Sequence, residues 1–573
     1  MLIRVLSRAV LLLVALTACR RAAPPDIPAA GWRLASRPVF TERAIVSSNS
    51  ELATAVGVEM LRRGGNAVDA AVAVAFALAV TYPEAGNIGG GGFMVARFAD
   101  GSTAAIDFRE VAPLAATRSM YADSASRTER RSLVGHLAVG VPGAVAGLTA
   151  ALDSLGTMRL RDVMQPAIRL ASEGFVVDSA LARSLASDSA LIGRFAGTRI
   201  FLPGGVPLRE GQRLVQPDLA RTLRRIAERG RQGFYEGETA DLIVAEMRRG
   251  GGLITHEDLS RYQPIWRRPV VGTYRGYTML GMPPSSSGGI TLIQTLNMLE
   301  TRERVPPFGS AGWTHLLAEA FRRAFIDRNT RLGDPAFVRV PVDTLTSKTY
   351  ARSLAETIEP ARATPSPSRP MAGREGTQTT HFSVVDEHGN AVALTTTINE
   401  LYGSGVFVEG AGFFLNDEMD DFTSRPGEPN TFGLIQGELN AIAPGKRMLS
   451  AMTPTIVLDR DGALLMVVGS RGGPRIITSV AQAILNVIDH GMTLADAVAA
   501  PRIHHQAWPD SLRYEPNGLA PSVVDSLRAM GHAVGEAPWG REGYSGRIHA
   551  VMRVRGGYVG VVDPRTSGGA AGY

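Results

Sequence analysis

Residues 379–397 read TTHFSVVDEHGNAVALTTT, and this stretch decides the fold. Residues 380–385 and 391–397 are rich in apolar and β-branched side chains, while DEHGN at 386–390 has the residues that turns require. The pattern predicts an antiparallel hairpin. Thr379 therefore stands where the chain enters a central strand.

The segment before this hairpin differs in composition. Residues 359–378 are rich in Pro, Ser, Arg, Gly and Thr, which predicts a linker or a plain surface loop. A Thr hydroxyl needs a neighbouring base to act as a nucleophile, and an N-terminal Thr carries one in its own α-amine. Cleavage between Gln378 and Thr379 would free that amine. Periodicity alone indicates only a strand here.

The rest of the chain predicts further strands and helices around the hairpin. Downstream, residues 448–458 and 463–468 are predicted strands, and a glycine-rich loop at 469–475 leads into an amphipathic helix over 476–489. Upstream, residues 140–330 are predicted to be mainly helical. At the end of this region we expect a long helix over Ala311–Arg331. A further helix, apolar on all sides and therefore buried, is expected over residues 70–80.

Four consecutive glycines, residues 89–92, precede a predicted strand hairpin over 93–98 and 103–108. No Lys-Ser/Thr follows them, and a strand rather than a helix comes next, so they are neither a P-loop nor a dinucleotide-binding turn. We interpret them as a place where backbones pack closely against one another.

Composition excludes several classes of protein. A chain of 573 residues with 45% hydrophobic and 20% charged residues is a large folded protein, not a disordered polyelectrolyte. The net charge of +6 comes almost entirely from arginines interleaved with acids, which argues against nucleic-acid binding. The single cysteine, Cys19, excludes an internal disulfide, and His504-His505 is a poor chelating pair because strand neighbours point to opposite faces. We expect no metal and no other cofactor.

Residues 1–18 are a predicted signal peptide, because two arginines precede an apolar run too short to span a bilayer. The sequence LTAC that ends at Cys19 resembles a bacterial lipobox, in which the cysteine is lipidated; an ordinary secretory signal is the alternative. Arg20 rather than Asp follows. We therefore expect anchoring through Cys19 in the cell envelope, at the outer membrane facing the periplasm, with residues 19–39 as a flexible tether.

The segments Thr379–Asp386 and Gly389–Ala393 resemble the start of the small subunit of the γ-glutamyltranspeptidases (glutathione hydrolases). Other motifs resemble the same family in the same order: Tyr82–Met94, Asp107–Glu110, Asn416–Phe422, Pro444–Ser450, Gly469–Arg475 and Asp563–Tyr573. The resemblance covers residues 40–573. It implies an N-terminal-nucleophile hydrolase fold, an α/β (α+β) four-layer αββα sandwich. It also implies a precursor that cuts itself at Gln378-Thr379 into a large subunit (40–378, with linker 359–378) and a small subunit (379–573), which remain together as a heterodimer.

The resemblance also implies the activity, hydrolysis and transfer of γ-glutamyl groups from amides such as glutathione to water, amino acids or peptides. The group would pass through an ester on Thr379, the implied nucleophile, whose hydroxyl Thr397 would hydrogen-bond. Gly472 and Gly473 would form the oxyanion hole. The implied ligands of the substrate are Arg109 and Ser450 for the α-carboxylate, and Asn399, Glu418 and Asp421 for the α-ammonium.

Two departures from the family pattern bear on the predicted pocket. Ala451 follows Ser450 where the family often has a second serine, so one hydroxyl to the α-carboxylate is missing. Phe432 stands where some bacterial members have tyrosine, which removes a hydroxyl from the segment over the site. Two alternative functions remain open: a glutaryl or cephalosporin acylase of the same fold, and a non-catalytic lipoprotein that keeps the fold as a binding module.

Overall fold

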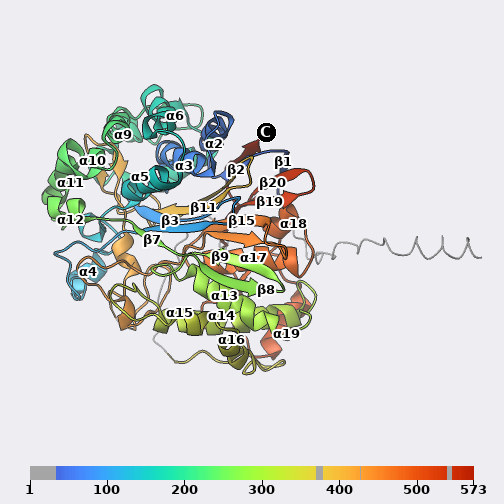
Figure 1. Ribbon diagram of the computed structural model, residues 1–573. Helices are drawn as coiled ribbons and strands as arrows, with labels where there is room; N and C mark the ends of the chain where they lie inside the picture. Colours follow the sequence, from blue (N-terminus) through green and yellow to red (C-terminus); the bar gives the residue numbers. More distant parts are fainter. Residues whose placement is uncertain (1–33, 369–378, 426, 538–544) are drawn as a thin grey trace, which may run out of the picture.

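The computed structural model describes residues 34–368, 379–425, 427–537 and 545–573. Two stacked seven-stranded sheets, each antiparallel throughout, lie between two layers of helices (Figure 1). This arrangement confirms the predicted αββα sandwich.

The first sheet has the strand order β21-β2-β10-β11-β3-β4-β7, and the second has the order β1-β20-β19-β15-β14-β9-β8. The strands of the first are β21 (Gly569–Gly572), β2 (Ile45–Ser48), β10 (Thr380–Val385), β11 (Ala391–Thr397), β3 (Gly91–Arg97), β4 (Thr103–Phe108) and β7 (Ile265–Arg267). Those of the second are β1 (Val39–Thr41), β20 (Gly557–Val562), β19 (Arg547–Val554), β15 (Leu464–Arg471), β14 (Thr455–Leu458), β9 (Tyr277–Gly281) and β8 (Val270–Tyr274).

Helices cover the outer face of each sheet. In Figure 1 the helices α2, α3, α5 and α6 lie above β3 and β11, whereas α13, α14 and α17 lie on the opposite side, by β8 and β9. The first layer has α2 (Glu51–Arg62), α3 (Ala67–Thr81), α5 (Ala144–Leu155) and α6 (Leu160–Glu173), with α9 (Pro217–Arg229), α10 (Gln232–Tyr235), α11 (Gly237–Gly250) and α12 (His256–Arg261) further out. The second has α13 (Gly288–Glu300), α14 (Ala311–Arg331), α15 (Val342–Thr346), α16 (Lys348–Ala355), α17 (Arg475–Ile488), α18 (Leu494–Ala499) and α19 (Pro521–Ala529).

The predicted hairpin over residues 380–397 forms the centre of the first sheet. β10 pairs with β11 in the register Thr380↔Thr396 to Val385↔Ala391. The turn is fixed by Asp386, whose Oδ1 accepts the backbone N–H groups of His388 and Asn390, both at 2.9 Å. Local turn chemistry therefore sets the register of the whole hairpin.

Side chains alternate along β10 and β11 between two apolar cores. Phe382, Val384, Val392 and Leu394 pack towards the first helical layer, and Val385, Ala391 and Ala393 pack in the core between the sheets. Both faces are therefore buried, and a fully buried Val, Leu or Phe contributes roughly 1.5–3 kcal/mol. The all-apolar α3 packs in the first of these cores, as predicted.

Some predictions required correction. The predicted strand over 448–458 is a strand only at β14, because Ser450 and its neighbours instead bond to residues 285–287. The region 140–330 also contains β7, β8 and β9, which extend both sheets. The long helix over Ala311–Arg331 is confirmed at both ends.

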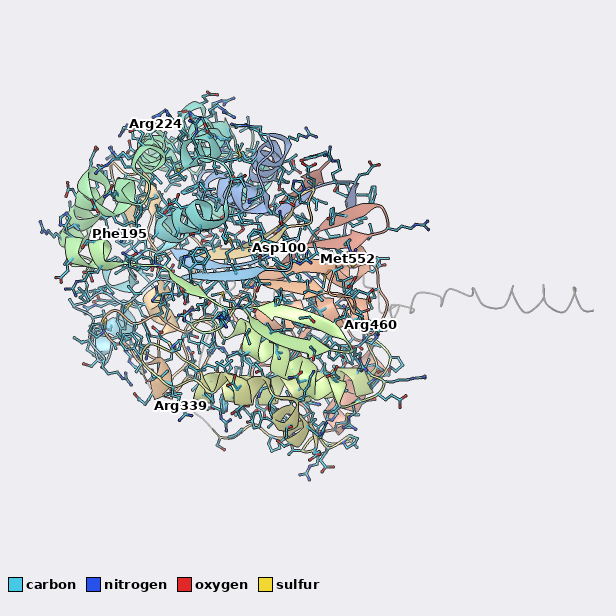
Figure 2. The ribbon with its side chains drawn as sticks, viewed as in Figure 1. Asp100, Phe195, Arg224, Arg339, Arg460 and Met552 are labelled. Atoms are coloured by element: carbon cyan, nitrogen blue, oxygen red, sulfur yellow. The ribbon has the colours of Figure 1, made fainter. Side chains whose placement is uncertain are left out.

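The predicted lipidation residue Cys19, the signal peptide and Gln378 lie outside the described residues. Within the described part of the chain, no helix is both long enough and apolar enough to cross a membrane. Arginines are spread over the surface, and Figure 2 shows exposed Arg224, Arg339 and Arg460 at well-separated places on the periphery.

Candidate active site

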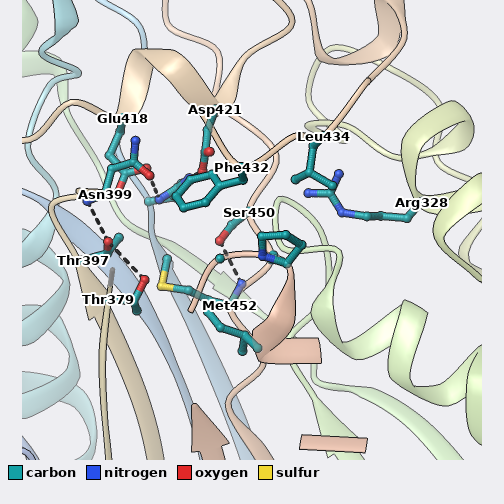
Figure 3. A pocket seen from close by; sticks show the side chains of 15 residues that line it. Arg328, Thr379, Thr397, Asn399, Glu418, Asp421, Phe432, Leu434, Ser450 and Met452 are labelled. Atoms are coloured by element: carbon teal, nitrogen blue, oxygen red, sulfur yellow. Dashed lines mark hydrogen bonds and ion pairs between the residues drawn. The ribbon is translucent and has the colours of Figure 1, made fainter. Parts of the chain in front are cut away.

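Thr379 lies directly before β10 and is 4% exposed. Its Oγ1 donates to Oγ1 of Thr397, the last residue of β11, at 3.4 Å. The backbone N–H of Asn399 donates to the same Thr397 oxygen at 2.8 Å. Figure 3 shows this chain of hydrogen bonds at one side of the pocket. The hairpin register places the two threonines opposite each other, so the fold itself builds the pair.

The four glycines provide close backbone packing beside this pair, as the sequence predicted. β3 pairs with β11 so that Gly91 lies opposite Thr397. A Cβ on Gly90 would overlap the carbonyl oxygen of Thr397, and one on Gly92 would overlap that of Thr395. Larger residues here would force β3 away from the strand that carries Thr397.

A buried ionic cluster lies at the other side of the pocket. Arg109 directly follows β4 and is 1% exposed. Its Nη1 lies 2.6 Å from Glu418 Oε2 and 3.5 Å from Glu110 Oε2, and its Nη2 pairs with Asp421 Oδ2. One guanidinium is thus surrounded by three carboxylates.

The pKa values of the carboxyl groups in this cluster are raised mainly by burial. Burial raises the pKa of Glu418 well above its usual range despite the nearby Arg109, with Glu110 and Asp421 adding to the rise. Burial likewise raises the pKa of Asp421 and brings that of Glu110 to about 7. Burial disfavours the charge on Arg109, but the carboxylates, Glu418 foremost, outweigh it and raise the Arg109 pKa. A cationic group of a ligand would stabilise these carboxylates.

Ser450 lies on a loop between the cluster and the second sheet. Its backbone N–H donates to Ser285 O at 3.0 Å, and its carbonyl accepts from Ser287 N at 2.8 Å and Oγ at 2.6 Å. Its own Oγ accepts from Met452 N at 3.1 Å. These bonds fix the Ser450 hydroxyl, which keeps its proton for a ligand.

Gly472 and Gly473 connect β15 to the N-terminus of α17. Both have positive φ, 129° and 56°, which disfavours other residues. Within the described part of the chain, no backbone acceptor receives their N–H groups. N–H groups of this kind at a helix N-terminus suit a developing negative charge.

These groups surround one pocket (Figure 3). It brings together eight predicted site residues: Arg109, Thr379, Thr397, Asn399, Glu418, Asp421, Ser450 and Gly473. Gly472 precedes Gly473 in the same loop. Ala451 and Phe432 also line the pocket, as expected from the two departures in sequence.

The sequence did not indicate the role of Arg328, which lines the pocket from α14. Its Nε donates to Ser287 Oγ at 3.0 Å, and its Nη1 donates to Gln436 Oε1 at 3.1 Å. Burial lowers its pKa to about 10, and the charge of Asp421 acts in the opposite direction. Because α14 carries several other arginines, no local pattern distinguishes this one.

Outside the pocket, among the described residues, His315, Glu319 and His532 form a group with metal-ligand side chains. His315 Nδ1 and His532 Nε2 already share a hydrogen bond of 2.7 Å. The Glu319 carboxylate pairs with both Arg322 and Arg323. These contacts and the two cations make the group a hydrogen-bonded cluster rather than a metal site.

Comparisons with known proteins agree with this geometry. The γ-glutamyltranspeptidase family model matches residues 53–573. A glutathione hydrolase proenzyme from Escherichia coli (strain K12) is 48% identical over 523 residues, covering 90% of each chain. An acylase ACY 1 proenzyme from Pseudomonas sp. (strain V22) is 40% identical over 527 residues, covering 90% of this chain and 92% of the relative.

A solved structure, a cephalosporin acylase from Bacillus halodurans, superimposes with a TM-score of 0.82 at 28% identity, covering 96% of this chain and 99% of that one. A match over most of the chain, with a buried Thr379–Thr397 pair at the start of the central hairpin, removes the alternative of a non-catalytic binding module. The protein is an enzyme, and the chain belongs to the γ-glutamyltranspeptidase family.

Proposed function

We propose that this enzyme cleaves γ-glutamyl amides such as glutathione and passes the γ-glutamyl group to water or to an amino-acid or peptide acceptor. The observation that carries the proposal is the single pocket with Thr379 at one side and the Arg109–Glu418–Asp421 cluster at the other. A γ-glutamyl group has a γ-carbonyl that Thr379 can attack, and a zwitterionic end that the Arg109–Glu418–Asp421 cluster can bind.

The chemistry would begin with self-cleavage between Gln378 and Thr379, which frees the α-amine of Thr379. That amine, with a reference pKa near 8, takes the Oγ1 proton as Oγ1 attacks the γ-carbonyl carbon. The N–H groups of Gly472 and Gly473 stabilise the oxyanion, at roughly 3 kcal/mol per donor. The ammonium then protonates the leaving amine, which leaves an ester on Thr379. Water or an acceptor amine attacks this ester, and the same α-amine again acts as the base.

Thr397 would orient the nucleophile. Its Oγ1 is fixed by the N–H of Asn399 and accepts from Thr379 in this structure. This keeps the Thr379 hydroxyl at the pocket wall, where an attacking atom needs to be.

Recognition of the substrate's zwitterionic end would be an exchange of ion pairs. In this structure, Arg109 pairs with Glu418 and Asp421. An incoming α-carboxylate takes the planar Arg109 group together with the Ser450 hydroxyl. The α-ammonium then replaces Arg109 as the partner of Asp421 and Glu418, with Asn399 Oδ1 as a further acceptor, since Asn399 Nδ2 is bonded to Asp417 O at 3.0 Å.

The second candidate function is a glutaryl or cephalosporin acylase, which the 40% identical acylase relative favours. A glutaryl group has no α-ammonium. It would therefore bring no cation to the buried carboxyl groups around Arg109, whose ionised forms burial already disfavours. We expect much faster hydrolysis of γ-glutamyl anilide than of glutaryl anilide by the purified enzyme, and a reversed preference would establish the acylase.

Self-cleavage has its own test. Denaturing gels should show two bands, with N-terminal sequencing of the smaller starting at Thr379. Thr379→Ala should give a single band and no turnover. Active protein that migrates as one intact chain would exclude the mechanism.

We also propose attachment to the cell envelope through a lipid on Cys19, at the outer membrane and facing the periplasm. The lipobox-like sequence supports this, and several acyl chains on one cysteine suffice for stable anchoring. Cys19→Ser should release the protein from the membrane fraction. If the native protein is recovered in the soluble periplasmic fraction, the lipid anchor is wrong.

A further inference from the structure

Residues 427–440, here named the lid segment, lie against the pocket. Phe432 and Leu434 from this segment line it. The Phe432 ring lies so close to Gly473 that a Cβ on this glycine would be 2.5 Å from the ring. The Phe432 ring therefore limits the space beside Gly473, and Figure 3 shows this ring between Asp421 and Ser450 in the pocket.

The turn that carries Phe432 is organised by Asn430. Its Oδ1 accepts the N–H groups of Phe432 at 3.0 Å and Leu434 at 3.1 Å. These bonds shape the turn. Other bonds attach it to the rest of the protein: the Phe432 carbonyl accepts from Gln506 Nε2 at 3.1 Å, Asn430 Nδ2 donates to Asp421 Oδ1 at 3.3 Å, and Thr431 is bound by Asp420.

Asp420, which is 4% exposed, makes the attachment that reaches the large-subunit side. Its Oδ2 accepts the backbone N–H of Thr431, the neighbour of Phe432, at 2.8 Å. Its Oδ1 accepts the Ser132 hydroxyl at 2.7 Å. Ser132 belongs to the part of the chain before residue 378, so one carboxylate connects the lid segment to the large-subunit side. Asp420 itself does not line the pocket.

Two ion pairs also join the lid segment to residues 118–127, and both are more exposed, whereas Gln436 near the end of the segment is bonded to the buried Arg328. Arg127 pairs with Glu428 at 2.6 Å, with exposed fractions of 65% and 44% for the two side chains. Arg118 pairs with Glu438 at 2.8 Å, with 38% and 68%. Exposed pairs contribute little to stability. The charge-assisted bonds of a buried carboxylate are stronger.

We propose that Asp420 is a positioning residue that holds Phe432 over the acyl pocket by binding Thr431 and Ser132 at once. It does not touch the reacting atoms. Its effect is to keep the lid segment closed, so that a bound acyl group is retained and water reaches the pocket less freely.

The kinetic test rests on the proposed γ-glutamyl activity. Asp420→Ala removes both bonds and should raise KM for γ-glutamyl anilide about tenfold with a smaller change in kcat. Asp420→Asn should restore KM to within about threefold of the native value, because its oxygen accepts from Thr431 and its NH₂ donates to Ser132 Oγ. Glu428→Gln, which removes the exposed pair between the same segments, is the matched control and should change KM less than twofold.

A second readout does not depend on the substrate. Hydrogen–deuterium exchange of the cleaved protein should be faster over residues 428–436 in Asp420→Ala than in Glu428→Gln or Asp420→Asn, with exchange over β10 and β11 unchanged. This separates the two proposals, because lid exchange can be measured even if γ-glutamyl turnover is absent. Equal exchange over 428–436 in all variants, or a KM that Asp420→Ala leaves unchanged, would overturn the role of Asp420.

Discussion

Replacing Asp421 by Asn tests the ion-pair exchange most directly. The side chain is buried, its Oδ2 pairs with Arg109 Nη2, and its Oδ1 accepts from Asn430 Nδ2 at 3.3 Å. Asn has the same size and keeps an acceptor oxygen, so the lid segment retains its bond. Only the negative charge is removed.

The magnitude follows from the burial of the partners. A buried charge that loses its partner costs roughly 3–5 kcal/mol, which corresponds to a loss of about 10²-fold to several thousandfold in kcat/KM. Glu418 remains beside the α-ammonium site, so the lower part of this range applies. Before substrate binds, Arg109 is still held by Glu418 at 2.6 Å and Glu110 at 3.5 Å, so the site for the α-carboxylate should persist in Asp421→Asn.

For glutaryl anilide the expectation has the opposite sign. This substrate brings no ammonium, and burial already raises the pKa of Asp421. Removing this carboxylate therefore relieves an unfavourable charge, and kcat/KM for glutaryl anilide should stay equal or rise. The γ-glutamyl to glutaryl ratio should fall by about 10²-fold or more.

The assay measures kcat/KM for both anilides on self-cleaved protein, with cleavage on a denaturing gel as the check of folding. Asp417→Asn is the matched control. Asp417 lies in the neighbouring turn and is fully buried, but it does not line the pocket. It should affect both substrates by the same factor. If Asp421→Asn leaves the ratio unchanged, the assignment of the ammonium site is refuted and the acylase function gains support.

Three further predictions follow from single residues. Ala451→Ser restores a hydroxyl at the pocket wall and should lower KM for γ-glutamyl anilide about fivefold, by one neutral hydrogen bond; an unchanged KM would place that hydroxyl away from the α-carboxylate. Gly473→Ala puts a Cβ 2.5 Å from the Phe432 ring at φ 56° and should lower kcat on the order of 10²-fold, whereas Gly491→Ala, at φ 63° with open space around it, should leave kcat unchanged. Burial raises the pKa of Asp420 to about 6 from its ordinary value of 3.8. The folded state therefore keeps this proton while the unfolded state loses it, so native stability falls as pH rises from about 4 to 6. Relative to Asp420→Asn, the native protein should lose up to about 3 kcal/mol of its free energy of unfolding between pH 4 and 6, and no more above pH 6. If the difference in melting temperature between the two proteins stays constant over this pH range, the raised pKa of Asp420 is contradicted.

The sequence predicted those elements that are determined by residues close to one another in the chain. The β10–β11 hairpin depends on strand-forming residues on either side of Asp386, and all of these lie within twenty residues of one another. The predicted strand over 448–458 failed for the opposite reason. Ser450 bonds to Ser285 and Ser287, which are far away in sequence, and no pattern within the segment indicates that partner.

The site residues were predicted from the family resemblance rather than from periodicity. Arg109 and Asp421 are each an ordinary charged residue in sequence, and only their meeting in the fold gives them a shared function. Arg328 was not predicted by the family resemblance or by periodicity. It reaches the pocket from the middle of a helix, where no motif surrounds it.

The site lies where the ends of several strands come together. In the first sheet, the start of β10, the end of β11, the start of β3 and the end of β4 lie at the same edge, because Thr380 pairs with Thr396, Thr397 with Gly91, and Gly92 with Phe108. Thr379, Thr397 and Arg109 therefore meet at this edge, although they come from distant parts of the chain.

In the second sheet too, the site residues lie next to strand ends. β15 ends at Arg471, just before Gly472 and Gly473, and β14 begins at Thr455, soon after Ser450. Cleavage before Thr379 breaks no strand pairing among the described residues, since Thr380 is the first paired residue of β10. β10 also lies between β2 and β11, and β11 pairs with β3. The two pieces thus share one sheet, and the new N-terminus stays at the strand edge where the pocket needs it.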